Sequence, residues 1–186
     1  MCIRDRFTAI SAFCNAGFDL FGRFGAYSSL VPYVNNYYVQ AVIMFMIMAG
    51  GLGFMVWVEL AEYRKKRRLS LHAKVVLQFS AIFWVGGAVL LALLEWSNPR
   101  TMGGLSVPGK IMAALFQSVS TRTAGMNTID LAACSPISKL LMSVLQFIGA
   151  APGSTGGGVK VTTFAVLILT IRSVAQGRDD CVIGGH

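Results

Sequence analysis

Two long uncharged stretches most constrain what this chain can fold into. Residues 39–58 and residues 75–94 each run for twenty positions without Asp, Glu, Lys or Arg. As helices they would each reach about 30 Å, which is the thickness of the hydrocarbon layer of a bilayer. The alternative, that both are core helices of a soluble protein, requires more surrounding protein than this chain supplies. We therefore predict two transmembrane helices.

The composition supports a membrane protein. Of the 186 residues, 55% are hydrophobic and only 13% are charged, whereas soluble domains average about 25% charged residues. So few charged side chains cannot coat a water-facing surface, which argues against a soluble enzyme and against a disordered chain.

The net charge of +8 comes largely from one run of five basic residues at positions 64–68. This run lies between the two apolar stretches and has no interleaved aromatic residues for base stacking, so we expect no nucleic-acid partner. A basic segment beside membrane spans is typical of a cytoplasmic loop. We predict that residues 63–74 form a cytoplasmic basic linker and that residues 98–133 lie on the opposite side.

No arrangement of residues indicates a catalytic or resident metal site. The four cysteines (Cys2, Cys14, Cys134 and Cys181) are scattered, and His72 and His186 are the only histidines. This pattern fits neither a zinc site nor a disulfide framework. We expect no enzyme, no catalytic residue and no covalently bound cofactor.

A third apolar region is interrupted in its middle. Residues 140–148 and 161–171 are apolar, but residues 149–158 between them (GAAPGSTGGG) are rich in glycine, and we call this segment the glycine loop. Neither half spans a bilayer alone, so together they predict one broken transmembrane helix. Irregular backbone at membrane depth occurs only where protein buries it or where it lines a wet cavity. A phosphate-binding Walker A loop is the competing interpretation, and it is disfavoured because Lys160 is followed by Val161 rather than by Ser or Thr.

Two short apolar segments are each followed by a polar, glycine-containing turn. Residues 7–13 precede the first glycine turn (residues 14–18), and residues 108–119 precede the second glycine turn (residues 123–127), with Gly17 and Gly125 108 residues apart. Both segments are too short to span, so we predict re-entrant half-helices in a repeated unit. The negative end of such a half-helix favours a cation, and glycine lets successive carbonyls face one side, as in potassium filters.

Three motifs in order resemble the Trk/Ktr/HKT superfamily of potassium transporters, and most closely the membrane subunit of the bacterial Ktr system. They are residues 11–21 (SAFCNAGFDLF), 118–130 (SVSTRTAGMNTID) and 152–160 (PGSTGGGVK). The resemblance implies an all-α membrane protein of four helix–pore-loop–helix units. This chain would be a fragment holding part of the second unit and the third unit, and it would lack the first and fourth.

The resemblance assigns roles to two groups of residues. The potassium filter would be formed by the two glycine turns, comprising Cys14, Asn15, Ala16, Gly17, Phe18, Thr123, Ala124, Gly125, Met126 and Asn127. The gate would be formed by the glycine loop, with Gly149, Pro152, Gly153, Ser154, Thr155, Gly156, Gly157, Gly158 and the following Lys160. Met126 departs from the family pattern, in which Phe is usual.

The resemblance also implies partners and a location. It implies K⁺ as the transported ion, dependence on Na⁺, a homodimer in the inner (plasma) membrane and a cytosolic nucleotide-binding regulatory ring. The expected organisation is a non-native or truncation segment at 1–6, one pore unit at 7–62, the linker at 63–74, the next unit at 75–178 and a truncated tail at 179–186. The alternative function is a secondary transporter that binds a small solute at the broken helix.

Two charged residues have alternative interpretations. Arg122 precedes the second glycine turn, and we expect it to brace backbone carbonyls or an acid such as Asp130 rather than to repel ions, because its fixed fork suits bracing. Lys160 lies within the broken span, where a charge is costly; it either tethers the glycine loop or extends toward cytoplasmic water.

Overall fold

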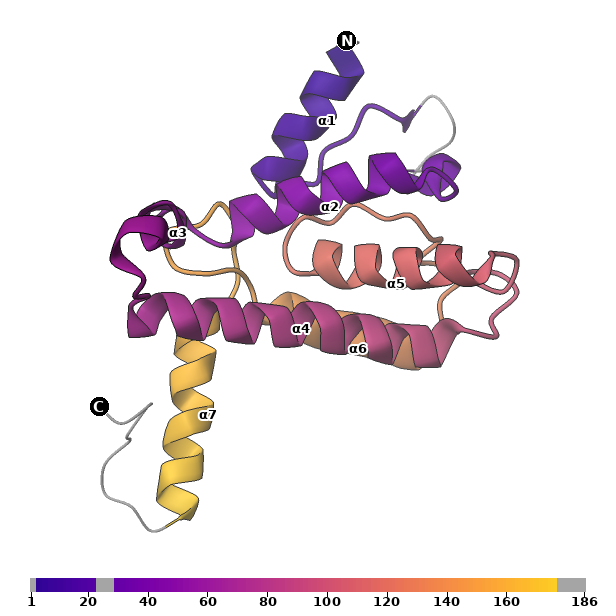
Figure 1. The fold of residues 1–186 in the computed structure, drawn as a ribbon. Helices are drawn as coiled ribbons and strands as arrows, with labels where there is room; N and C mark the ends of the chain where they lie inside the picture. Colours follow the sequence, from indigo (N-terminus) through magenta and orange to yellow (C-terminus); the bar gives the residue numbers. More distant parts are fainter. Residues whose placement is uncertain (1–2, 23–28, 177–186) are drawn as a thin grey trace.

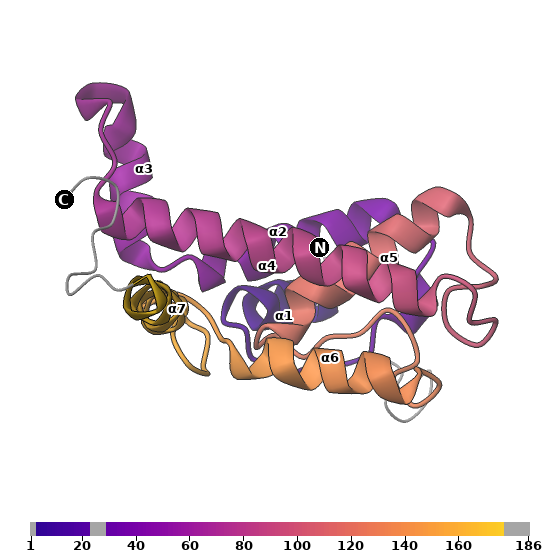
Figure 2. The same cartoon turned by 90° about the horizontal axis from the view of Figure 1, so that it is seen from below.

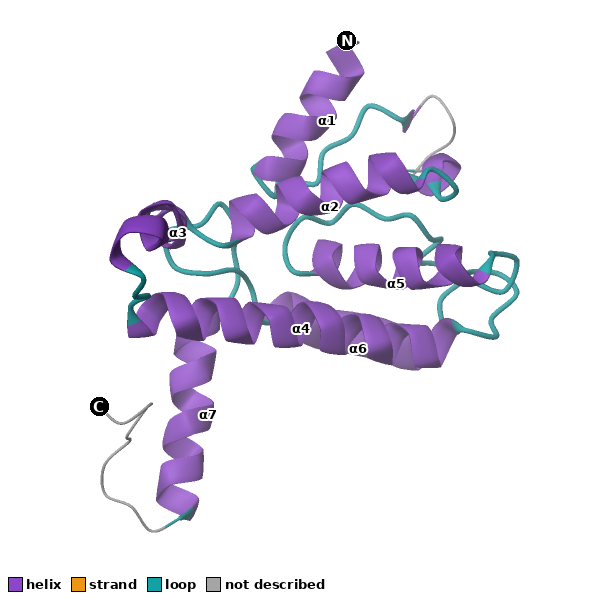
Figure 3. Cartoon of the chain, viewed as in Figure 1, coloured by secondary structure: helices purple, strands orange, loops and turns teal. Residues whose placement is uncertain are grey.

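The computed structural model describes residues 3–22 and 29–176. Their regular structure is helical, apart from a single bridge between Ile148 and Val159 (Figures 1 and 3). The helices are α1 (Ile3–Phe13), η2 (Val31–Tyr33), α2 (Tyr37–Gly51), α3 (Phe54–Lys66), α4 (Leu71–Glu95), α5 (Val107–Thr121), α6 (Pro136–Phe147) and α7 (Val161–Ala175). The predicted all-α membrane fold class is confirmed.

Helix α4 is the second predicted span. It has 25 residues, contains the whole of the uncharged stretch 75–94, and is capped by Ser70, whose side chain accepts a hydrogen bond from the Ala73 amide. It is the one helix among the described residues that alone is long and apolar enough to cross a membrane. Its face with Ile82, Val85, Val89 and Leu93 is exposed, as suits contact with lipid or with further protein.

The first predicted span is not a single helix. Residues 39–58 are divided between α2 and α3, which meet at an angle of 98°. Gly53 at the bend has φ +82°, a conformation that side chains other than glycine rarely adopt. The prediction of one straight helix is therefore wrong, and we call residues 50–53 the elbow. Helix α3 extends to Lys66, so only residues 67–70 separate it from α4, a shorter connection than the expected linker 63–74.

Both predicted half-helices are present as helices. Helix α5 begins at Ser106, which caps it with Pro108 in the first turn, and it covers the predicted segment 108–119. Helix α1 begins at Ile3, four residues before the predicted segment 7–13. Residues 3–6, expected to be foreign to the fold, thus continue α1, while residues 1–2 lie outside the described part.

The third apolar region is broken where predicted. Helices α6 and α7 lie on either side of the glycine loop and point in different directions, with α6 alongside α4 and α7 projecting away from it (Figures 1 and 2). The two halves are therefore not collinear. Most of the expected tail at 179–186 follows the last described residue, and nothing is said of its structure.

Three apolar clusters hold the helices together. One joins α1, α2 and α5 through buried residues that include Ala12, Ile43 and Phe116, and the second glycine turn contributes Ala124 and Met126 to it. A second joins α4, α5 and α6, and a third joins α3, α4 and the glycine loop through Ala151. The second glycine turn and the glycine loop are thus anchored in the core.

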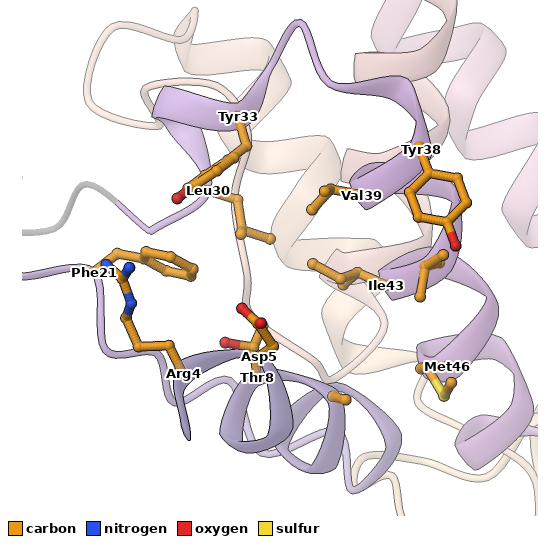
Figure 4. Close-up of a pocket in the computed structure, with 12 residues that line it drawn as sticks. Arg4, Asp5, Thr8, Phe21, Leu30, Tyr33, Tyr38, Val39, Ile43 and Met46 are labelled. Carbon is orange, nitrogen blue, oxygen red and sulfur yellow. The ribbon is translucent and has the colours of Figure 1, made fainter. Parts of the chain in front are cut away.

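A pocket of about 380 Å³ opens between α1 and α2 (Figure 4). Its wall is mostly apolar, with Phe21 packed on Tyr33 at a ring distance of 5.3 Å and with Arg4, Asp5 and Thr8 on the α1 side. No residue of either glycine turn or of the glycine loop lines it. It is therefore separate from the site predicted from sequence.

Candidate functional site: two glycine turns above a glycine loop

The two glycine turns lie against each other. A side chain on Gly17 would collide with the carbonyl oxygen of Ala124, and its first atom would lie 3.7 Å from the Cα of Gly125. The segments are more than 100 residues apart in sequence, so tertiary packing alone brings them together. The turns thus meet by backbone contact, which only a glycine at position 17 permits.

The two turns share a backbone conformation. In the first, Asn15 and Gly17 have positive φ values of +51° and +74°; in the second, Thr123 and Gly125 have values of +102° and +78°. The alanine between each pair is not in this left-handed region. The same alternation therefore recurs in both turns, and it is unusual because residues other than glycine rarely adopt positive φ. When positive and negative φ values alternate along the backbone, successive carbonyls point in directions that differ from those in a regular strand or helix.

The half-helices deliver these turns in a similar manner. The Ala16 amide donates to the Ser11 carbonyl at 2.9 Å and the Gly125 amide donates to the Ser120 carbonyl at 3.0 Å, so each helix ends in a wide turn that spans six residues. Ser120 also donates its hydroxyl proton to the Met126 carbonyl. Each turn therefore begins at the carbonyl end of a helix, where the helix dipole is negative.

The residues after the two glycines have different surroundings. Phe18 is 69% exposed, whereas Met126 is 1% exposed and belongs to the α1–α2–α5 cluster. Cys14 and Ala16 are exposed and Asn15 is buried. The repeat is thus close in backbone but not in side-chain packing.

The glycine loop is closed on itself. Gly149 donates to the Val159 carbonyl at 3.0 Å and Ala150 donates to the Gly157 carbonyl at 3.2 Å. The backbones approach so closely that a side chain on Gly149 would collide with Gly157. Gly153 and Gly158 have positive φ values of +67° and +76°. Glycine at these positions is a geometric requirement of the loop.

The glycine loop is also bound to the elbow between α2 and α3. Ala151 donates to the Gly51 carbonyl at 3.0 Å, and Thr155 donates to the Gly50 carbonyl at 3.2 Å. In the other direction, the Phe54 amide at the start of α3 donates to the Gly153 carbonyl at 3.2 Å. These bonds satisfy carbonyls that the break in the helix leaves without helical partners. The break between α2 and α3 and the break between α6 and α7 therefore supply hydrogen-bond partners to each other.

Arg122 braces the glycine loop from the end of α5. Its Nη2 donates to the Gly149 carbonyl at 2.7 Å, and its guanidinium lies 5.4 Å from the Phe83 ring and 5.8 Å from the Trp84 ring of α4. The residue is 5% exposed. The expectation of a brace on a backbone carbonyl is confirmed, while Asp130 accepts a hydrogen bond from the Ala132 amide instead.

Lys160 contacts the glycine loop. Its Nζ donates to the Gly156 carbonyl at 2.7 Å, so a residue at the start of α7 holds the second half of the loop. Arg122 and Lys160 thus bind the two ends of the same loop through carbonyl oxygens.

The space between the first glycine turn and the loop is very small. A cavity of about 10 Å³ is lined by Asn15, Arg122, Ala150 and neighbouring residues of α2, α4 and α5. That volume accommodates about one water molecule. The loop therefore lies directly against the turns.

Two features of this region were not anticipated from the sequence. One is the elbow, for which the cluster of Gly50, Gly51 and Gly53 is the available signal. The other is the hydrogen bond from the Asn15 side chain to the Thr155 hydroxyl at 2.9 Å, for which the sequence carries no signal because 140 residues separate the partners.

Comparison with known proteins assigns the family. Residues 5–182 match the family described as TrkH, cation transport protein. The chain belongs to the TrkH family. The resemblance to the Trk/Ktr/HKT superfamily is thereby confirmed.

Individual relatives of this TrkH-family chain agree. It is 42% identical over 165 residues to the Ktr system potassium uptake protein B of Vibrio alginolyticus, covering 88% of this chain and 35% of the relative. It is 37% identical over 172 residues to the potassium/sodium uptake protein NtpJ of Enterococcus hirae, covering 92% of this chain and 37% of the relative. The chain spans little more than a third of these relatives.

A solved structure has the same fold. The crystal structure of the potassium transporter TrkH from Vibrio parahaemolyticus matches with a TM-score of 0.71 and 22% identity, over 94% of this chain and 37% of that one. At this identity the match establishes the fold of this TrkH-family chain.

Proposed function

We propose that this chain is part of the pore subunit of a potassium-uptake transporter, in which the two glycine turns form half of a carbonyl-lined filter and the glycine loop is its gate. The observation that carries the proposal is the recurrence of one left-handed backbone alternation in two turns that touch through their main chains. Backbone carbonyls that replace a hydration shell are the usual means of binding K⁺ in a filter.

The names of the relatives support the choice of ion. Both relatives described above are named as potassium uptake proteins, and one of them also as a sodium uptake protein. Neither glycine turn offers a carboxylate, so the ligands available there are neutral oxygens, which suit a monovalent cation. We retain Na⁺ as the candidate activator.

The contacts of the glycine loop support its role as a gate. It lies directly against the turns with room for about one water molecule, and hydrogen bonds from Arg122 and Lys160 hold it there. We infer that a segment in this position would obstruct the passage of an ion beyond the turns.

The remaining components are part of the proposal. A ring of carbonyls needs more than two strands, so the complete transporter would supply two further pore units, the first and the fourth. We also propose a homodimer in the inner membrane, regulated by a cytosolic nucleotide-binding ring, as the names of the Ktr-system relatives suggest a transporter of several components.

The test is ion uptake by the complete transporter in bacteria that lack other potassium-uptake systems. We expect K⁺ uptake, and we expect Gly125→Ser to lower the preference for K⁺ over Na⁺, because φ +78° strains any side chain and displaces the adjacent carbonyls. An unchanged K⁺/Na⁺ ratio would contradict the filter assignment. Shortening residues 153–158 should raise unstimulated uptake; unchanged uptake would contradict the gate assignment.

A further inference from the structure

One residue of the glycine loop contacts three other parts of the site. The Thr155 hydroxyl accepts a hydrogen bond from Asn15 Nδ2 at 2.9 Å and donates one to the Phe13 carbonyl at 3.0 Å. The Thr155 amide donates to the Gly50 carbonyl at 3.2 Å. Thr155 therefore joins the end of α1, the first glycine turn and the elbow.

The Phe13 carbonyl and the Asn15 side chain, which the Thr155 hydroxyl binds, both need a partner from another part of the chain. Phe13 is the last residue of α1, and carbonyls in the last turn of a helix lack intrahelical donors. Asn15 has a left-handed φ of +51° and is buried, so its side-chain bond helps to fix an unfavourable backbone conformation within the turn. Loss of the hydroxyl would leave both groups without this partner.

The space around Thr155 is tightly defined. A side chain on Gly50 would collide with the Phe13 carbonyl and would lie 2.9 Å from Thr155 Oγ1. The end of α1, the elbow and the loop thus converge on one point. Yet the Thr155 side chain is exposed in this chain, so it is not a core residue, and replacing it with Val removes no apolar packing.

The neighbouring hydroxyl provides a contrast. Ser154 donates to the Ala151 carbonyl at 2.5 Å and accepts from the Gly156 amide at 3.4 Å. Both partners of Ser154 lie within the glycine loop. Two adjacent hydroxyl residues therefore differ in one respect: Ser154 organises the loop internally, whereas Thr155 connects it to the first glycine turn.

We propose that Thr155 is a positioning residue that couples the filter to the gate, so that the loop cannot leave its position without releasing Asn15. This inference rests on the proposed function of the turns and the loop. Since the same hydroxyl holds both, displacement of the loop frees the turn, and a change in the turn weakens the hold on the loop. Coupling of this kind is reciprocal between the two sites.

The coupling predicts two effects from one substitution. In the complete transporter, Thr155→Val removes both side-chain hydrogen bonds and keeps the shape of the residue. Each neutral hydrogen bond contributes about 0.5–1.5 kcal/mol, so we expect unstimulated K⁺ uptake to rise about fivefold or more. The K⁺/Na⁺ uptake ratio should fall at the same time, because Asn15 loses its partner.

The experiment measures K⁺ and Na⁺ uptake by the purified complete transporter in liposomes, with and without the regulatory component. Thr155→Ser keeps the hydroxyl and should retain the wild-type unstimulated K⁺ uptake and K⁺/Na⁺ ratio. The matched control Ser154→Ala should retain the wild-type K⁺/Na⁺ ratio. In a double-mutant cycle, Asn15→Ala combined with Thr155→Val should do no more than the larger single change, because both remove the same bond.

The outcomes separate this inference from the proposed function. If the unmodified transporter takes up K⁺ but Thr155→Val behaves like Ser154→Ala, or if the effects of Asn15→Ala and Thr155→Val simply add, the coupling is overturned and the proposed function stands. A rise in uptake with an unchanged K⁺/Na⁺ ratio also overturns it, because the loop would then move independently of the filter. If the unmodified transporter takes up no K⁺, the proposed function is wrong and the coupling is overturned with it.

Discussion

The carbonyl oxygen of Ala124 occupies the position that a side chain on Gly17 would need. This contact joins two segments that the sequence separates by more than a hundred residues, and it does so through main-chain atoms. At the equivalent position of the second turn, a side chain on Gly125 would meet no atom of the described residues within 4 Å. The two glycines thus share a conformation but differ in their neighbours.

Gly17→Ala in the complete transporter is expected to reduce K⁺ uptake at least about tenfold. The left-handed conformation costs a side chain about 1–2 kcal/mol, and the collision with the Ala124 carbonyl forces the two turns apart. Uptake of K⁺ at equal protein level is the measurement. Gly86→Ala in α4 is the control, because a side chain there meets nothing within 4 Å; equal uptake by the two variants would contradict the contact.

Arg122→Gln is expected to destabilise the fold by about 1.5–3 kcal/mol, the usual contribution of a hydrogen bond to a charged group. The Gly149 carbonyl loses its 2.7 Å donor, and the Phe83 and Trp84 rings lose a cation. Thermal unfolding in detergent measures the effect. Arg100→Gln serves as control because Arg100 is exposed, and a melting temperature lowered equally by both variants would argue against the brace.

Glu95→Gln is expected to lower the melting temperature as well. Glu95 ends α4, is fully buried and accepts hydrogen bonds from Asn98 and Thr101 at 2.7 Å and from the Ser135 amide at 2.8 Å. The side-chain NH2 group of Gln would face N–H and O–H groups that need an acceptor. Each buried group left without a partner would lower the free energy of unfolding by about 1–3 kcal/mol. Asp130→Asn should have a much smaller effect, because Asp130 is exposed and its carboxylate accepts a hydrogen bond from the Ala132 amide of the same turn. Equal decreases in melting temperature for the two variants would contradict the buried hydrogen bonds to Glu95.

Thiol labelling should distinguish Cys134 from Cys14 once Cys2 and Cys181 are replaced by Ser. Cys134 is buried, and this burial raises the pKa of its thiol to about 11, whereas Cys14 is exposed. Because the thiolate is the reactive form, roughly one Cys134 thiol in a thousand is ionised at pH 8. Maleimide should therefore modify Cys14 first, and the rate at Cys134 should increase as the pH rises toward 11. Rapid labelling of Cys134 at pH 8 would show that the α4–α5–α6 cluster is not formed.

The sequence patterns predict the elements that depend on local composition. The uncharged stretch 75–94 lies within α4, and Pro108 lies in the first turn of the predicted half-helix α5. The elbow escapes the same reasoning because its residues Gly50, Gly51, Leu52 and Gly53 are as uncharged as a straight span. Hydropathy measures affinity for lipid and carries no information on direction.

Hydrogen bonds between residues far apart in the chain cannot be predicted from the sequence for a different reason. Arg122 suits a brace by its chemistry, but its partner Gly149 is one of many carbonyls that it could bind. The bond between Asn15 and Thr155 depends on how α1, the elbow and the glycine loop converge, which no spacing in the chain encodes. Glu95 shows both cases: Asn98 and Thr101 follow it closely in the chain, whereas Ser135 reaches it only when the start of α6 packs against the end of α4.

The bond from the Phe54 amide to the Gly153 carbonyl has a mechanical consequence. Helix α3 leaves the elbow at 98° to α2 and ends in basic residues. Its first residue, Phe54, is hydrogen-bonded to the glycine loop. The first amide of α3 therefore cannot move away from the glycine loop without breaking this hydrogen bond.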